Sequence, residues 1–219
     1  MKRIAATALT LLALGAAACG SSGSRGSSGA RPVDNPWFPL KTGSVWRYTG
    51  IKDGKPSVDV VKVPGATKRI QGVVTTAVDD RLYLKGKLEE RTTDWYAQDK
   101  QGNVWYYGED TAELDSHGKV KSTEGSWEAG TGGAQAGLFM PADPRPGDSA
   151  RQEYYKGHAE DHFRVLRRSA ANVLTEEWTP LEPGVIDHKH YRRGVGTVLE
   201  ETVKGGVERN VLRSFKAGS

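Results

Sequence analysis

Two histidines in the stretch "IDHKHY" have a spacing that could bind a transition metal. In a β-strand, His188 and His190 point to the same face, and imidazole nitrogens are common zinc ligands. A third ligand could come from His158, Asp161 or His162 in "GHAEDHF". Two ligands do not specify a metal site, so an exposed strand face with two polar side chains is the simpler interpretation.

The stretch "DWYAQDKQGNVWYYGED" (residues 94–110) is rich in aromatic residues and predicts a hairpin. Asp99 to Asn103 is typical of a three-residue loop in which Gly102 adopts a left-handed conformation. That register places three rings on one face and two on the other: Trp95, Trp105 and Tyr107 against Tyr96 and Tyr106.

One of these aromatic sets can supply the core of the domain, and the other needs a cover. The cover could be the protein's own loops, a ligand or a partner. If it is a ligand, we expect Trp95, Trp105 and Tyr107 to form the wall, or Tyr96 and Tyr106 if the register is inverted.

Catalytic signatures are missing from the sequence. It contains no GxSxG, HExxH, GxxxxGK[ST] or CxxC motif. The segment "GVGTV" lacks the third glycine of a dinucleotide-binding fingerprint. The sequence therefore predicts no catalytic residue, no cofactor and no enzymatic activity.

The elements that would position these residues are mostly β-strands, because apolar residues recur with a period of two. Hairpin turns are predicted at Gly54, Gly86, Gly102 and Gly118, and another at residues 205–206. Residues 150–169 come nearest to a helical pattern, but Gly157 interrupts it, and two strands are the better interpretation. We predict a mainly β fold with little helix. It is a curled antiparallel meander sheet or half-barrel, with a long covering loop over residues 124–150.

The N-terminal residues predict export. Lys2 and Arg3 precede an apolar run, and a run of small residues then leads into Cys19, the one cysteine of the chain. This order is typical of a secretory signal and resembles the lipobox of bacterial lipoproteins, although Ala16 stands where Leu is usual. We expect residues 1–18 to be a lipoprotein signal peptide and Cys19 to be acylated by at least two chains, as stable anchoring requires. The alternative is a free thiol.

The rest of the chain divides into a tether and one domain. Residues 19–35 are rich in Gly and Ser, which predicts a flexible tether spanning roughly 20 Å. Residues 36–215 suit a single β domain. Without Lys2 and Arg3, 29 of the 31 basic residues remain against 27 acidic ones, a net charge of +2. Since no dense basic run is present, nucleic acid is not an expected partner.

The stretch "NPWFPLKTGSVWRYTG" (residues 35–50) resembles a group of uncharacterised, largely actinobacterial lipoproteins that open with Phe-Pro-Leu-Lys-x-Gly-x-x-Trp-x-Tyr. The resemblance continues through "STEGSWEAG", "MPADPRPGD", "EWTPLEPGVIDHKHY" and "GVGTVLEETVKGG". It departs at Arg192 and Arg193, where a small residue and Pro are common in the family. The resemblance implies a lipoprotein but no activity and no site residues.

Together these features predict a non-enzymatic binding or interaction module on the extracytoplasmic face of the cell membrane. Its expected partners are the membrane, through the lipid anchor at Cys19, and a hydrophobic or other envelope ligand. A carrier of a lipid or hydrophobic small molecule is one alternative. A metal-binding protein or metal-dependent enzyme using His188 and His190 is another. The sequence does not indicate an oligomeric state.

Overall fold

The computed structural model describes residues 32–219, and all regular structure in them is β-strand. This confirms the predicted mainly β fold. The strands are β1 (Val45–Lys52), β2 (Lys55–Lys62), β3 (Thr67–Ile70), β4 (Val73–Leu84), β5 (Lys87–Gln98), β6 (Val104–Leu114), β7 (Val120–Ser122), β8 (Trp127–Glu128), β9 (Gln135–Met140), β10 (Ser149–Arg151), β11 (Glu153–Tyr154), β12 (His162–Arg168), β13 (Asn172–Trp178), β14 (Ile186–Arg192), β15 (Gly196–Lys204) and β16 (Arg209–Lys216).

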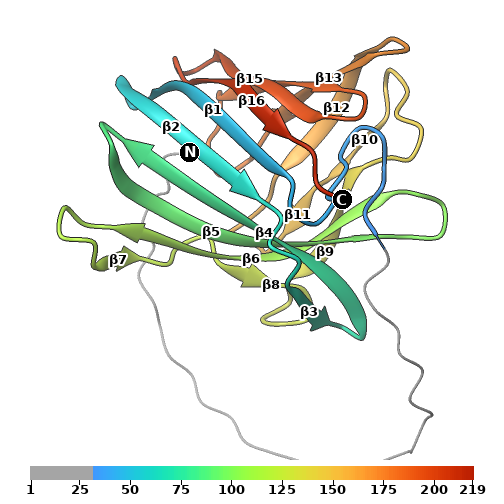
Figure 1. Cartoon of the computed structure of the whole chain (residues 1–219). Helices are drawn as coiled ribbons and strands as arrows, with labels where there is room; N and C mark the ends of the chain where they lie inside the picture. Colours follow the sequence, from blue (N-terminus) through green and yellow to red (C-terminus); the bar gives the residue numbers. More distant parts are fainter. Residues whose placement is uncertain (1–31) are drawn as a thin grey trace, which may run out of the picture.

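The strands form one antiparallel sheet that curls into a nearly closed barrel (Figure 1). Along the sheet the order is β10-β12-β13-β14-β15-β16-β1-β2-β4-β5-β6-β9-β11, so the first and last long strands of the domain are neighbours. The two ends of this order, β10 and β11, follow each other in the chain. Because β10 pairs with β12 and β11 pairs with β9, one short segment joins the two edges of the sheet.

The predicted hairpin turns are confirmed. Asp53 and Gly54 join β1 to β2 with φ of 51° and 67°, and Lys85 and Gly86 join β4 to β5 with 50° and 80°. Two successive residues with positive φ are the mark of a type I′ turn, whose twist matches that of the flanking strands. Gly102 and Gly118 close the next two hairpins, and residues 205–208 connect β15 to β16.

Two further segments, residues 124–150 and residues 150–169, also contain strands. Residues 150–169 contain no helix and contribute to β10, β11 and β12, as predicted. Residues 124–150, predicted as a covering loop, are only partly irregular. They contain β8 and β9, which both pair with β6 and so extend the sheet itself.

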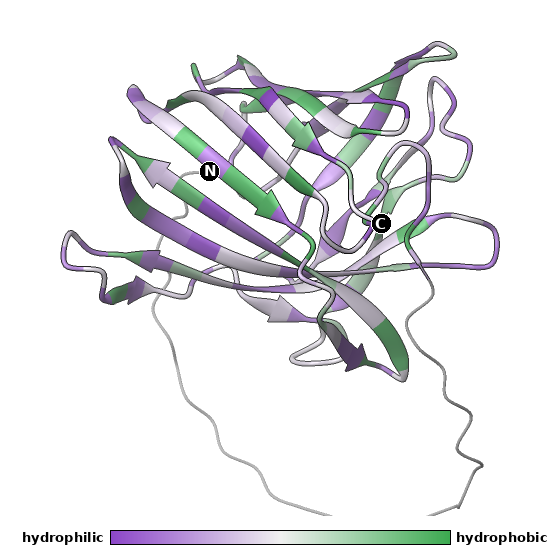
Figure 2. Cartoon of the chain, viewed as in Figure 1, coloured by the Kyte–Doolittle hydropathy of each residue, from purple (hydrophilic) through white to green (hydrophobic). Residues whose placement is uncertain are grey.

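Side chains alternate between the interior of the barrel and its outer surface, as the changing hydropathy along the strands in Figure 2 indicates. The hydrophobic core lies toward one end of the barrel. Its largest fully buried side chains include Trp37, Phe163, Ile70, Met140 and Tyr191.

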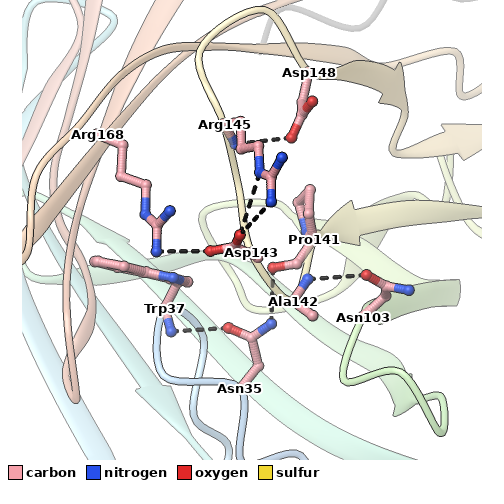
Figure 3. Close-up of polar contacts among 9 residues, drawn as sticks. All are labelled: Asn35, Trp37, Asn103, Pro141, Ala142, Asp143, Arg145, Asp148 and Arg168. Carbon is pink, nitrogen blue, oxygen red and sulfur yellow. Dashed lines mark hydrogen bonds and ion pairs between the residues drawn. The ribbon is translucent and has the colours of Figure 1, made fainter.

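That end of the barrel is closed by residues 33–40, which precede the first strand (Figure 3). The Asn35 side chain donates hydrogen bonds to the carbonyl oxygens of Gly102 and Pro141, each at 3.0 Å. Its own Oδ1 accepts the Trp37 backbone N–H at 2.8 Å. We refer to residues 33–40 as the cap. Asp143, in the loop after β9, binds the Arg168 guanidinium at 2.7 Å, and that guanidinium lies over the Trp37 ring of the cap, 5.8 Å from its centroid.

The domain is therefore longer than the predicted range of 36–215. Val33 and Asn35 are buried, although the sequence placed them in the tether, because Asn35 satisfies polar groups of two other loops. At the other terminus, the Gly218 and Ser219 backbone N–H groups bond to Ser44 Oγ and Thr42 O.

The predicted signal peptide (1–18), the acylation site Cys19 and the tether as far as residue 31 lie outside the described residues. Within residues 32–219, no helix is long and apolar enough to span a membrane.

Candidate functional site

Four polar side chains lie across the middle of the barrel and face its interior. They are Asp59 on β2, Asp80 on β4, Glu200 on β15 and Asn210 on β16, and they line two cavities at once. We refer to these four residues as the polar belt. Strand pairing brings them together. Asn210 lies directly opposite Glu200. Asp59 and Asp80 lie on the neighbouring strands β2 and β4, two positions out of register.

The smaller cavity, about 140 Å³, lies between the polar belt and the closed end. Its wall is mostly apolar and aromatic: Phe38, Pro39 and Leu40 of the cap and Trp46, Tyr48, Tyr96 and Phe139 of the strands. The Trp46 indole and Tyr48 hydroxyl groups bond to backbone carbonyls of residues 195 and 197 at 2.7 and 3.0 Å. These rings are therefore fixed in place.

The larger cavity, about 650 Å³, extends from the polar belt to the opposite end of the barrel. Its walls are the ends of β1, β2, β4, β5, β15 and β16 together with the loop before β14. In Figure 1 the β1–β2 and β4–β5 turns lie at the left, away from the capped end. Ile51 and Val207 line this cavity although they are 47% and 74% exposed, so the mouth has an apolar rim.

The Asp59 and Asp80 carboxyl groups are hydrogen-bonded to each other, which requires a proton on one of them. Burial, followed by the charge of Asp59, holds the pKa of Asp80 well above its ordinary value. Burial also raises the pKa of Asp59, although hydrogen bonds from Asp80 and Asn210 oppose the shift. The pair therefore resembles other close carboxyl pairs, which share one proton because both cannot ionise cheaply.

A buried lysine lies next to the polar belt. Lys189 Nζ is 2.8 Å from Glu177 Oε2 and 3.6 Å from Glu200 Oε1. Burial opposes its charge, but Glu177 and Glu200 outweigh that effect and raise the pKa of Lys189 well above normal. Glu177 also accepts hydrogen bonds from the hydroxyl groups of Thr175 and Tyr191. The charge of Lys189 is thus fully engaged by the protein.

Of the predicted aromatic residues, Tyr96 and Tyr106 face the interior. Their rings stack with centroids 4.7 Å apart, and both contact Phe139 edge-on. The Tyr106 hydroxyl donates to Asp94 Oδ1 at 2.5 Å. Tyr96 also lines the smaller cavity, so this pair belongs to the core and to a cavity wall together.

Trp95 and Trp105 share one face, as predicted, and it is the outer face. The predicted register also pairs Trp95 with Tyr107, and this pairing is wrong. A β-bulge shifts the register, so that Trp95 lies opposite Gly108. The missing side chain of Gly108 allows β8 to pair with β6 there, since a Cβ atom on Gly108 would lie 2.3 Å from the Trp127 carbonyl oxygen. Lys68 covers the Trp95 ring at 3.9 Å, so on this face the cover is the protein itself.

The histidine pair is on one outer face, as predicted, but it gathers no further metal ligand. His188 Nε2 is 4.0 Å from Glu176 and His190 Nε2 is 3.8 Å from Glu201. The proposed third ligands contact other residues: His162 stacks on Trp178, His158 stacks on Tyr155, and Asp161 forms a side-chain hydrogen bond with Thr179. Within residues 32–219, no three His, Cys, Asp or Glu side chains are arranged to hold a metal ion.

Sequence reasoning missed the polar belt entirely. The signal was a carboxylate on the same strand face as an apolar residue, for example Asp59 two positions before Val61. In β4, however, Asp79 and Asp80 are adjacent, so alternation alone does not tell which of them faces inward. Only the pairing of β4 with β2 and β5 decides that Asp80 does.

Comparison with known proteins adds little to this geometry. No family model and no curated protein matches the sequence. Among solved structures, the chain is similar to a "putative lipoprotein" from Parabacteroides distasonis ATCC 8503. The identity is 11% and the TM-score 0.37, with 86% of this chain and 100% of the other covered. A similarity this weak carries no argument about function.

Proposed function

We propose that this protein is a non-enzymatic binding module of the cell envelope, and that it holds a small molecule in the larger cavity of its barrel. The observation behind the proposal is the cavity itself. Its volume of about 650 Å³ lies within the range of typical small-molecule sites. Rigid strands on several sides and a few polar groups at the bottom are also typical of such sites.

The composition of the cavity wall supports binding in preference to catalysis. Of the residues that the structure describes, neither a histidine nor a cysteine lines the larger cavity. The alternative of a purely hydrophobic ligand fits the lining less well. A lipid chain reaching the polar belt would bury carboxyl groups without offering them a hydrogen-bond donor, and leaving polar groups unpaired is costly. An amphiphilic ligand satisfies both the apolar rim and the polar belt.

We also propose that the module is anchored to the membrane by acylated Cys19. The support is the order of positive, apolar and small residues before that cysteine, and the resemblance to lipoproteins. The test is partition into detergent phase: the wild-type protein should enter it and a Cys19→Ser variant should not. Equal partition of the two would argue against the anchor.

The binding proposal is tested by looking for a bound molecule and blocking its space. Thr202 lines the larger cavity, whereas the next residue, Val203, is 48% exposed on the outer face. Mass spectrometry of gently purified protein should find a small molecule bound to the wild type and to Val203→Trp. The Thr202→Trp variant should be purified without this molecule, because the added ring fills the cavity. A wild-type protein free of any ligand would contradict the proposal.

A further inference from the structure

We propose that the larger cavity recognises an organic cation: an amphiphile with a protonated amine that reaches the polar belt and an apolar part that rests at the rim. This inference rests on the proposed function and specifies its ligand class.

The first support is the charge of the cavity wall. Among the described residues, eight that bear carboxyl groups and two that are basic line the larger cavity. The acidic residues are Asp53, Asp59, Asp80, Glu90, Glu182, Asp187, Glu200 and Glu208; the basic ones are Lys52 and Arg209. A cavity lined this way concentrates positive ligands and repels negative ones.

The two basic residues do not neutralise the polar belt. Arg209 Nε is directed to Glu201 Oε2, at 3.3 Å, outside the cavity. Burial opposes the charge of Lys52, but Glu90 and Glu208 outweigh it and raise the lysine pKa, which ties Lys52 to those two carboxylates. Because Lys189 offsets Glu200 and Asp80 shares a proton with Asp59, the negative charge that remains at the bottom of the cavity is the single charge of the Asp59–Asp80 pair.

The second support is a shortage of hydrogen-bond donors at the polar belt. Asn210 Nδ2 donates to Asp59 Oδ2 at 3.1 Å, but Asn210 Oδ1 is fully buried and accepts no hydrogen bond from the described residues. Asp59 Oδ1 is equally buried, and apart from the proton shared with Asp80 it has no donor within residues 32–219. Such acceptors are rarely left unpaired in folded proteins, and an ammonium group offers three donors.

The third support is the rim. Ile51 and Val207, which line the cavity mouth, are two of the large apolar side chains that the domain leaves exposed. Leu181 and Val185 line the same cavity. Covering these side chains would bury apolar area and contribute on the order of 25 cal/mol per Å². The ligand should therefore carry an apolar part next to its charge.

A bare metal ion fits this wall less well than an amine. The carboxyl groups of the described residues are not arranged in any set of three that could hold a metal ion. An ammonium group needs no such close coordination, because each of its N–H groups forms a separate hydrogen bond. The volume of about 650 Å³ also exceeds by far what one ion fills.

The test compares n-octylammonium with two probes of equal chain length, 1-octanol and octanoate, by isothermal titration calorimetry. The full chain carries Cys19→Ser, so that no detergent competes for the cavity. We expect n-octylammonium to bind at least tenfold more tightly than the neutral and anionic probes. The double variant Asp59→Asn/Asp80→Asn removes the one negative charge that this carboxyl pair carries, and Glu200→Gln removes the charge of Glu200, each at constant size; both should weaken binding at least fivefold.

The matched control is Glu201→Gln, because Glu201 follows Glu200 in β15 and faces outward. It should bind n-octylammonium within twofold of the parent, and circular dichroism should show all variants folded. Equal binding of 1-octanol or octanoate would overturn the cationic class but leave the binding function intact. If Ca²⁺ binds and displaces n-octylammonium, the cavity is a metal site, and the proposed organic cation is wrong. If no probe binds and no native ligand is found, both proposals fail.

Discussion

At the scale of single residues, the polar belt combines groups that stabilise the fold with groups that oppose it. The positive charge of Lys189 is paired with the carboxylates of Glu177 and Glu200, so these buried charges offset one another. Asp80 is different, because the groups facing it are the carboxyls of Asp59 on β2 and of Glu90 and Asp94 on β5. Binding residues are often held in such unfavourable surroundings, and stability then improves when they are replaced.

We predict that Asp80→Asn stabilises the protein increasingly as the pH rises. The folded state raises the Asp80 pKa and so keeps a proton that the unfolded chain releases. Between the unfolded and folded pKa values, the wild-type free energy of unfolding therefore falls by about 1.4 kcal/mol per pH unit for this one group. An asparagine cannot titrate and still donates a hydrogen bond to Asp59.

Urea denaturation from pH 4 to pH 8 measures this effect. The difference between variant and wild type should be smallest at pH 4 and should grow with pH. Asp79→Asn is the control, since Asp79 precedes Asp80 in β4 but lies on the outer face. A constant difference across the pH range would show that Asp80 is ionised in the folded protein.

At the scale of elements, the pairing of β1 with β16 depends on the absence of a side chain at Gly50. A Cβ atom there would lie 1.7 Å from the Arg209 carbonyl oxygen, a backbone atom that cannot move alone. Gly50 lies between Tyr48, at the smaller cavity, and Ile51, at the larger one. The close approach of these two strands therefore shapes the wall at the polar belt.

We predict that Gly50→Ala separates β1 from β16 and lowers the free energy of unfolding by more than about 3 kcal/mol, as severe overpacking does. Hydrogen exchange should accelerate at residues 49–51 and 209–211. Gly54→Ala is the comparison, because no atom lies within 4 Å of its added Cβ and only the positive φ opposes it. Gly54→Ala should lower the free energy of unfolding by only about 1–2 kcal/mol and should not accelerate hydrogen exchange in β16.

The strands and turns were largely predictable from sequence, whereas the side chains that point into the barrel were not. Gly54, Gly86, Gly102 and Gly118 mark turns because each has a positive φ, a local property. The register shift between Trp95 and Tyr96 is not local, since it lies where β6 pairs with both β5 and β8, and one extra residue reverses the inward and outward sides. The interior carboxylates were missed for the same reason.

At the scale of the whole molecule, the barrel depends on the short segment formed by β10 and β11. Between these strands lies Gln152, whose backbone N–H donates to the Asp161 carbonyl oxygen at 2.8 Å. Its side-chain Nε2, by contrast, is buried and has no partner within residues 32–219. Backbone and side chain at this position therefore make opposite contributions to stability.

We predict that Gln152→Pro opens the barrel between β9 and β12, because proline removes this N–H group. The free energy of unfolding should fall by roughly 3 kcal/mol, and hydrogen exchange should accelerate in β9 and β12. Gln152→Met keeps the backbone and removes only the unpaired amide, so it should be neutral or slightly stabilising. If both variants lower the free energy of unfolding by a similar amount, the Gln152 side chain, and not its backbone N–H group, stabilises the fold.

The neighbouring position of β1 and β16 has a consequence for how the chain is made. Arg213 donates to Thr49 across 164 residues of sequence, so β1 has no partner on that side until translation is nearly complete. Sheets that depend on such distant contacts form slowly. For a polypeptide that is secreted as its N-terminal residues predict, this delay keeps the chain unfolded and able to pass through a translocon before the barrel can close.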